Sequence, residues 1–267
     1  MESGTVTNKR CAVVIPIYKN SFSHDEQCCV MKYVQVLKGE DIFFIAPENL
    51  NTDYYETEFP DIRYKRYKDK YFKGILGYNK LMLSTDFYDS FSEYEYMLIA
   101  QPDACIWREE NMLEYFMDMD FDYYGAPWIP ARRIWEWAPV RSGQDGRRRI
   151  VCLKKEGNGI EMGNGGFSLR RISSCRKLIK EFAWRKSYWY IKRNEDIFFG
   201  VFGRGSKNNF KLCDVANGLK FAGEYNIKEL VLEGRTPFGV HGWSKYFDSY
   251  EDMQKFLEEN DVWKKHR

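Results

Sequence analysis

Long apolar runs alternate with amphipathic stretches along the first part of the chain. Residues 11–18, CAVVIPIY, are uncharged throughout and are followed by Lys-Asn. This pattern is typical of a strand that is buried on both faces of a parallel sheet. Residues 24–37 place apolar side chains at spacings of three and four behind Ser23, which predicts a helix with Ser23 as its N-cap. The chain is therefore expected to begin with a β-α unit.

The same alternation continues as far as the segment APW. It predicts further strands and helices, with strands at 41–46, 62–67, 94–100 and 123–127 and helices at 74–83 and 111–119. Strands that alternate with helices form a mostly parallel sheet with helices on both faces. At 267 residues the chain is within the range of one α/β domain, and we expect a single domain.

Residues 132–155 differ in composition from the rest of the chain. They carry RRIWEW, RSGQDGRRR and LKK, which are basic and aromatic with glycines between them. This composition predicts a long loop or an irregular hairpin. Beyond it, the pattern predicts a helix at 173–183, another that opens at Asn194, a short polar strand near Phe210 and an amphipathic helix at 250–260.

The overall charge argues against a general nucleic-acid binder. The sequence has 41 Lys and Arg against 39 Asp and Glu, a net charge of +2, whereas such binders carry a strongly basic face. No uncharged apolar run is long enough to span a bilayer, and the start MESGTVTNKR lacks the apolar core of a secretory signal. We expect a cytoplasmic chain whose seven cysteines, which lack a zinc-binding spacing, are free thiols.

Two residues are candidate metal ligands. Asp103 follows the strand at 94–100 through Gln101-Pro102, which places it at the sheet edge where ligands collect in α/β folds. His241 lies in the loop FGVHGW and is one of three histidines. A carboxylate and an imidazole can hold a divalent cation. The structural alternatives are that Asp103 caps a turn and that His241 packs within its loop.

Two further motifs combine flexible and acidic residues. The string Gly163-Asn-Gly-Gly166 allows a ligand to approach the backbone closely, or it forms an ordinary turn. Glu195 and Asp196 follow Asn194 at a predicted helix start, where acids favour the positive end of the helix dipole. Alternatively, one of these carboxylates is a general base that removes a proton from a hydroxyl nucleophile.

Together these strings resemble the motifs of a known family. YEYMLIAQPDA, YYGAPW, GNGGFSLR, NEDIFF and PFGVHGW are similar to motifs of a family of predicted GT-A-fold glycosyltransferases that is described as a domain of unknown function. The resemblance runs from Val13 to Trp243. The order of the motifs is also distantly similar to that of β-1,4-galactosyltransferases, which have Asp-x-Asp, Gly-Gly, an acidic cluster and a metal-binding His.

The resemblance implies a GT-A-like (Rossmann-like) fold with two functional halves. The nucleotide-binding half is expected at 11–130, the acceptor and catalytic half at 131–248, and a C-terminal helix at 249–260. The implied donor-binding residues are Pro16, Ile17 and Tyr18 at the nucleotide base, Asn79, Lys80 and Gln101 at the ribose or phosphates, Gly165 and Gly166 at the sugar, and Lys245 at a phosphate oxygen.

The implied metal and base positions follow from the same resemblance. Asp103 stands where the second acid of the Asp-x-Asp motif binds Mn²⁺ or Mg²⁺, and His241 matches the late metal-binding His. Gln101 replaces the first acid and offers a weaker, uncharged ligand field. Glu195 or Asp196 stands at the position of the base.

The resemblance therefore predicts a metal-dependent, hexosyltransferase-like glycosyltransferase of polysaccharide biosynthesis. It would move a sugar from a nucleotide-diphosphate sugar, expected to be a UDP-sugar, to a hydroxyl of a glycan or glycolipid acceptor. A carboxylate base implies inversion at the anomeric carbon, whereas a retaining enzyme would not need that base. Two alternatives stay open. A nucleotidyltransferase would share the sheet and the metal, and a non-catalytic carbohydrate-binding protein would use the aromatic side chains alone.

Residues 132–155 are a candidate acceptor-side lid. Trp135 and Trp137 can stack on an acceptor sugar, and the Arg-Arg-Arg run at 147–149 can meet an anionic acceptor or a lipid diphosphate at a membrane surface. The alternative is a solvated basic loop whose Trp side chains pack on the body of the protein. Under the first interpretation the cytoplasmic protein contacts a membrane peripherally.

Overall fold

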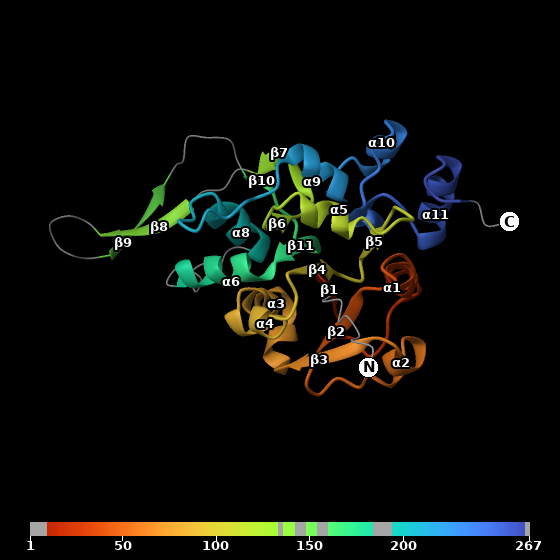
Figure 1. Ribbon diagram of the computed structural model, residues 1–267, viewed down its shortest axis with the longest axis horizontal. Coiled ribbons are helices and arrows are strands. Elements are labelled where there is room, and N and C mark those ends of the chain that lie inside the picture. The colour runs from red at the N-terminus through yellow and green to blue at the C-terminus, as the bar shows by residue number, and fades with distance from the viewer. Residues whose placement is uncertain (1–9, 133–135, 142–147, 154–159, 184–193, 265–267) are drawn as a thin grey trace, which may run out of the picture.

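A six-stranded sheet forms the centre of the molecule (Figure 1). The computed structural model describes residues 10–132, 136–141, 148–153, 160–183 and 194–264. The strands are β1 (Cys11–Pro16), β2 (Asp41–Pro47), β3 (Arg63–Tyr67), β4 (Tyr96–Ala100), β6 (Tyr123–Tyr124) and β11 (Phe167–Arg171), in the order β3-β2-β1-β4-β11-β6. The first four run parallel, and β11 is antiparallel to both of its neighbours. The predicted α/β fold with a mostly parallel central sheet is confirmed.

Helices flank the sheet on both sides. They are α1 (His24–Val36), α2 (Asp53–Glu58), α3 (Gly74–Met82), α4 (Thr85–Asp89), α5 (Leu113–Asp118), α6 (Ile172–Glu181), α8 (Glu195–Gly203), α9 (Val215–Phe221), α10 (Ile227–Leu232) and α11 (Tyr250–Glu259). Two 3₁₀ turns, η1 (Asp69–Phe72) and η2 (Trp243–Lys245), lie between them. In Figure 1, α1 lies on one side of β1, β2 and β3, and α3 and α4 lie on the other. Within the described ranges, no helix is long and apolar enough to cross a membrane.

Three smaller sheets complete the fold. A three-stranded sheet joins β12 (Ala222–Gly223), β13 (Gly239–His241) and β5 (Ala104–Ile106) in that order. A second pairs β7 (Pro127–Arg132) with β10 (Ile160–Met162), and a third pairs β8 (Glu136–Arg141) with β9 (Arg148–Leu153). Because β5 begins directly after the turn that ends β4, the three-stranded sheet brings the late chain to the carboxyl edge of the central sheet.

Local sequence explains the first β-α unit. All six residues of β1 are buried, as expected for a continuous apolar run in the middle of a parallel sheet. Ser23 caps α1 through a capping box, in which its Oγ accepts a hydrogen bond from the Glu26 N–H and Glu26 Oε2 accepts one from the Ser23 N–H. This reciprocal arrangement satisfies two N–H groups that a helix start leaves without partners.

The structure corrects the sequence analysis at two places. The hydrophobic pattern does not predict α2, α4, α9 or α10, because five to seven residues are too few for a clear helical period. The polar strand predicted near Phe210 is wrong, since in the described part of the chain this segment makes one isolated bridge, from Leu212 to Tyr123. The Phe210 ring instead stacks against Phe199 of α8, with 6.2 Å between ring centroids.

The basic segment at 132–155 contains a β-hairpin. β8 pairs antiparallel with β9, with Glu136 opposite Leu153, and in Figure 1 the two strands project from the body of the molecule. Of the predicted acceptor-side residues, Trp135 lies outside the described residues, and so does Arg147. Trp137 lies in β8, where only the backbone is described. The acceptor-side lid therefore stays a prediction.

Tyr33 connects α1 to the turn after β4. It is fully buried, and its Oη donates to the backbone oxygens of Gln101 (2.9 Å) and Ala104 (2.5 Å). These two carbonyls flank Asp103, so one phenol group fixes both ends of the turn that carries this carboxylate. The Gln101 carbonyl also accepts from the Ala104 N–H (3.0 Å), so the phenol adds a tertiary hydrogen bond to a turn that already has one of its own.

We expect Tyr33→Phe to lower the free energy of unfolding by about 1 kcal/mol, because the turn loses its phenol donor while the ring still fills its space and the Gln101 carbonyl keeps the Ala104 N–H. Urea denaturation measures this change. Tyr115, whose side chain is 45% exposed, provides the matched control, and Tyr115→Phe should alter the free energy of unfolding by less than about 0.5 kcal/mol. Equal effects of the two substitutions would show that the Tyr33 hydroxyl does not hold the turn.

Candidate active site

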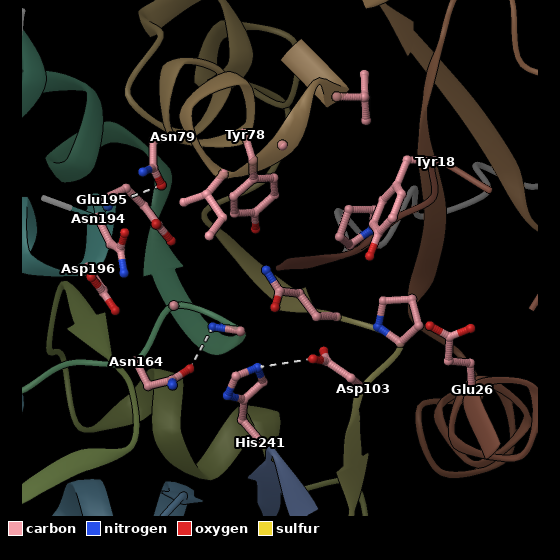
Figure 2. A pocket seen from close by; sticks show the side chains of 18 residues that line it. Tyr18, Glu26, Tyr78, Asn79, Asp103, Asn164, Asn194, Glu195, Asp196 and His241 are labelled. Carbon is pink, nitrogen blue, oxygen red and sulfur yellow. Dashed lines mark hydrogen bonds and ion pairs between the residues drawn. The ribbon is translucent and has the colours of Figure 1, made fainter. Parts of the chain in front are cut away.

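A pocket of about 520 Å³ lies at the carboxyl ends of β1 and β4 (Figure 2). Its lining comes from seven parts of the chain. The lining residues are Pro16 and Tyr18 at the end of β1, Glu26 of α1, Phe72, Gly74, Ile75, Tyr78 and Asn79 around α3, Gln101, Pro102 and Asp103 after β4, Asn164, Gly165 and Gly166 before β11, Asn194, Glu195 and Asp196 at the start of α8, and His241 of β13. Ligands of open α/β sheets bind at this edge.

Most of the predicted donor-binding, metal-binding and base residues line this pocket. The exceptions in these three groups are Ile17, Lys80 and Lys245. Ile17 is buried, and its N–H donates to the Ile45 backbone oxygen. Lys80 is exposed on α3. Lys245 lies beside the pocket, where it pairs with Glu224.

Strand pairing brings Asp103 and His241 together. β13 pairs antiparallel with β5, with His241 opposite Ala104, the residue after Asp103. Asp103 Oδ2 lies 3.6 Å from His241 Nε2, and the Asp103 side chain is 58% exposed toward the pocket (Figure 2). Burial raises the pKa of Asp103, but the neighbouring His241 outweighs this effect and the net shift is downward. The carboxylate is therefore available in its charged form.

Close contacts with His241 and Glu195 leave no room for a side chain at the two glycines before β11. A Cβ atom on Gly166 would lie 2.3 Å from Cδ2 of His241 and 2.5 Å from its Nε2. A Cβ atom on Gly165 would lie 2.0 Å from Oε1 of Glu195. The Gly166 N–H also donates to Oδ1 of Asn164 (2.8 Å), and the Gly166 carbonyl accepts from the Gln101 N–H (2.8 Å). The Gly-Gly turn thus packs the imidazole and the first acid of α8 against the backbone.

Glu195 forms a buried ion pair with Arg170. Arg170 lies in β11 and is fully buried, and its Nη2 donates to Glu195 Oε1 over 2.9 Å. Its remaining N–H groups donate to Ser168 Oγ (3.0 Å) and to Tyr88 Oη (3.2 Å). Burial lowers the pKa of Arg170, but Tyr88, Tyr123 and Glu195 together raise it well above its usual value. The pair holds the start of α8 against the central sheet.

Asp196 is the second acid at the start of α8. Its Oδ1 accepts a hydrogen bond from the Ile197 N–H (2.6 Å), and in Figure 2 its carboxylate faces the pocket. Asn194 has the extended backbone of an N-cap residue, but its side chain makes no capping hydrogen bond. The first turn of α8 therefore presents polar side chains to the pocket.

Two polar atoms of α3 lie at the pocket without a partner among the described residues. They are Tyr78 Oη and Asn79 Nδ2, and both are buried. In Figure 2 the Tyr78 hydroxyl is directed toward the cavity, and Asn79 lies beside Glu195, whose N–H donates to Asn79 Oδ1 (3.4 Å). Buried polar atoms are nearly always paired, so unpaired ones at a cavity point to a polar ligand.

Glu224 also belongs to this site, although no sequence signal points to it. This residue follows β12, is 7% exposed, and has its Oε1 3.9 Å from His241 Nδ1 and 3.1 Å from Lys245 Nζ. Burial raises the pKa of Glu224, but His241, Asn164 and Lys245 outweigh it and lower the pKa to about 2. The segment AGEY has no motif, and only the parallel pairing of β12 with β13 shows that Glu224 is part of the site.

His241 lies between two carboxylates. Burial lowers the pKa of His241, but Asp103 and Glu224 outweigh this effect and raise the pKa to about 9. A cation that binds at Nε2 must therefore displace a proton.

Residues 61–241 match the family described as "Protein of unknown function (DUF5672)". The chain belongs to the DUF5672 family. The matched stretch contains Asp103, the Gly-Gly turn, the acids of α8 and His241, so the family shares the region that builds most of the pocket. No curated protein matches the sequence.

The DUF5672 chain is similar in structure to solved glycosyltransferases. An active-site mutant of LgtC is 12% identical and aligns over 96% of this chain and 97% of that chain, with a TM-score of 0.57. The galactosyltransferase LgtC in complex with donor and acceptor sugar analogues gives 12% identity, the same coverage and a TM-score of 0.54. The apo bifunctional glycosyltransferase WbbM gives 12% identity over 96% of this chain and 50% of that chain, with a TM-score of 0.52. At this identity the likeness shows the fold, which is the predicted GT-A fold.

The donor atoms beside Gly166 fit a divalent cation. Two ligands about 2.1 Å from one ion lie roughly 3 to 3.5 Å apart when they are adjacent, and Asp103 Oδ2 and His241 Nε2 are 3.6 Å apart. Mg²⁺ is usually held by one or two carboxylates and completed by waters and substrate phosphates, which suits an open pocket with few protein ligands. A second possible metal cluster in the described chain, His24, Cys28 and Glu251, lies on the surface between α1 and α11.

We expect Arg170→Met to lower the free energy of unfolding by about 3 to 5 kcal/mol, because it leaves the Glu195 carboxylate buried without its partner. Arg235 is the control, since its side chain is 57% exposed and its ion pair is with Glu233, whose side chain is 56% exposed. Arg235→Met should cost no more than about 1 kcal/mol. Chemical denaturation measures the free energy of unfolding of both variants. Similar losses in the two would contradict a dominant role for the buried ion pair.

Proposed function

We propose that this DUF5672 protein is a glycosyltransferase that moves a sugar from a nucleotide-diphosphate sugar to a hydroxyl of a glycan or glycolipid, with a divalent cation. The observation that carries this proposal is the convergence of Asp103, His241, the Gly-Gly turn and the acids of α8 on one pocket of a GT-A fold. A pair of candidate metal ligands and a carboxylate base that line the same cavity are the parts that such a transfer needs.

We place the donor nucleotide at the end of β1. Tyr18 is 57% exposed and lines the pocket beside Pro16, so its ring is available to stack on a base. Ile17 is buried beneath it, and we assign Ile17 a supporting role rather than a contact. Asn79 Nδ2, which has no partner among the described residues, and the side-chain amide of Gln101 are our candidate donors to ribose or phosphate oxygens. UDP is the nucleotide we expect.

The cation site is assigned to Asp103 and His241. A divalent cation there, Mn²⁺ or Mg²⁺, would neutralise the charge that develops on the diphosphate as the glycosidic bond breaks. Asp103 supplies the negative charge, and the Gly166 backbone holds the imidazole in place. Lys245, half exposed beside Glu224, is placed to reach a phosphate oxygen.

The base is assigned to Asp196 ahead of Glu195. Both acids line the pocket, but Glu195 Oε1 is held by Arg170 and packed on Gly165. Such a fixed carboxylate suits the shaping of the sugar site better than the acceptance and release of a proton. A carboxylate base beside the acceptor hydroxyl favours inversion of the anomeric carbon.

We expect the wild-type protein to hydrolyse at least one member of a panel of nucleotide-diphosphate sugars, UDP-sugars first, in the presence of Mn²⁺. The matching nucleotide at a hundred times its dissociation constant should stabilise the fold by about 2.7 kcal/mol. Asp103→Asn and His241→Ala should abolish the Mn²⁺-dependent part of this stabilisation, measured by thermal melting. Unchanged nucleotide protection in both variants would contradict the assigned site, and a requirement for a nucleoside triphosphate would indicate a nucleotidyltransferase.

We expect Asp196→Asn to slow sugar transfer by about 10² to 10⁴, the usual effect of losing a general base. Asp214 supplies the control, because it also lies at a helix start, caps α9 through the Asn217 N–H, and is outside the pocket lining. Asp214→Asn should leave the rate unchanged. If neither Asp196→Asn nor Glu195→Gln slows transfer more than tenfold, the base lies elsewhere or configuration is retained, and the product anomer seen by proton NMR separates these outcomes.

A further inference from the structure

We infer that Glu224 is a positioning residue of the cation site, where it orients the imidazole of His241 and holds Lys245 toward the diphosphate end of the donor. This inference rests on the function proposed above. It assigns a role to a buried carboxylate that lies behind the pocket and that no sequence motif marks.

Strand pairing fixes the position of Glu224. β12 runs parallel to β13, and Gly223 lies opposite Val240. Glu224 follows Gly223 and His241 follows Val240, so these two residues are neighbours. Glu224 is 7% exposed, which makes it one of the few buried acids of the described chain. A buried carboxylate is unfavourable unless it is paired, so its two cationic neighbours are the reason that it can be charged there.

The imidazole of His241 is held from both edges. Asp103 lies 3.6 Å from Nε2, and Glu224 lies 3.9 Å from Nδ1. A proton on Nδ1 that faces Glu224 leaves the lone pair of Nε2 directed toward Asp103, which is the tautomer that can bind a cation there. Carboxylates on the far side of a metal-binding His commonly set its tautomer and ring orientation in this way.

The facing polar atoms of Glu224 and His241 do not form a hydrogen bond with each other in this structure. Within the described part of the chain, His241 Nδ1 and Glu224 Oε2 are both buried without a hydrogen-bond partner. A separation of 3.9 Å is too long for a hydrogen bond, so the two side chains attract each other as charges. A movement of less than about 1 Å would form the bond, and the ordering of the imidazole by a cation at Nε2 favours that movement.

Glu224 also holds Lys245. Its Oε1 lies 3.1 Å from Lys245 Nζ, and the turn that allows this contact passes through Gly242 at a φ of +64°. The Lys245 side chain is 56% exposed, so its ammonium group keeps access to solvent and to a ligand. One buried carboxylate thus organises an imidazole and an ammonium group on the same side of the pocket. Among the described residues, Asp103 and Glu224 are the acids that lie within ion-pair distance of His241.

Mn²⁺ affinity, measured from the electron paramagnetic resonance signal of free Mn²⁺, tests this role without any assay of activity. The His24→Ala protein serves as the parent, which removes the surface cluster of His24, Cys28 and Glu251 as a competing site. Glu224→Gln keeps the shape and removes the charge, and we expect it to weaken Mn²⁺ binding by about 10- to 100-fold. Glu224→Asp keeps the charge and should weaken it less.

Glu229→Gln is the matched control, because Glu229 is an exposed acid on the adjacent helix α10, and it should leave the Mn²⁺ affinity within twofold of the parent. An unchanged affinity in Glu224→Gln, together with loss of Mn²⁺ in Asp103→Asn and His241→Ala, would overturn the role of Glu224 and leave the cation site intact. Unchanged affinity in all three would overturn the cation site itself. If Glu224→Gln does not fold, Glu224→Asp decides: a change above threefold supports the role, and a smaller change overturns it.

Discussion

The antiparallel pairing of β13 with β5 is the constraint on which the pocket depends. It places His241 opposite Ala104, and thereby beside Asp103, at the carboxyl edge of the central sheet. β11 runs antiparallel to β4 with Phe167 opposite Ala100, so the Gly-Gly turn before β11 is delivered to the same edge. The Phe167 ring packs on the backbone of Gly239 in β13, where a Cβ atom would lie 2.3 Å from the ring. The two sheets approach so closely at this point that only glycine fits at position 239.

Charge buried behind this edge gives the pocket its shape before a ligand arrives. Arg170 and Glu195 pair in the core, and Glu224 pairs with Lys245 and lies within ion-pair distance of His241. Burying an ion pair is often no better for stability than burying apolar side chains of the same volume. The presence of two such groups around one cavity is therefore better explained by the positioning of polar side chains than by the stability of the fold.

Local signals in the sequence predicted the scaffold well. The apolar run of β1, the capping box of Ser23 and the strand-end position of Asp103 each depend on neighbours in sequence, and each is present in the structure. Glu224 and Arg170 could not be found in this way. Arg170 lies inside a strand, and its charge is paired with Glu195, which is distant in sequence. Glu224 lies near His241 only because β12 pairs with β13. The missing signal in both cases is tertiary contact. Short helices such as α9 and α10 are missed for a different reason. Helices of one or two turns are stabilised by packing and caps, and they are too short to show a clear hydrophobic period.

The most direct measurement is a crystal structure of the protein soaked with Mn²⁺ and UDP, with diffraction data collected at the manganese absorption edge. The structure predicts an anomalous peak within ligand distance of both Asp103 and His241, with the diphosphate of UDP beside the Gly-Gly turn. A peak that occurs only at His24, Cys28 and Glu251, with UDP absent from the pocket, would contradict the assignment of this pocket as a nucleotide-sugar site.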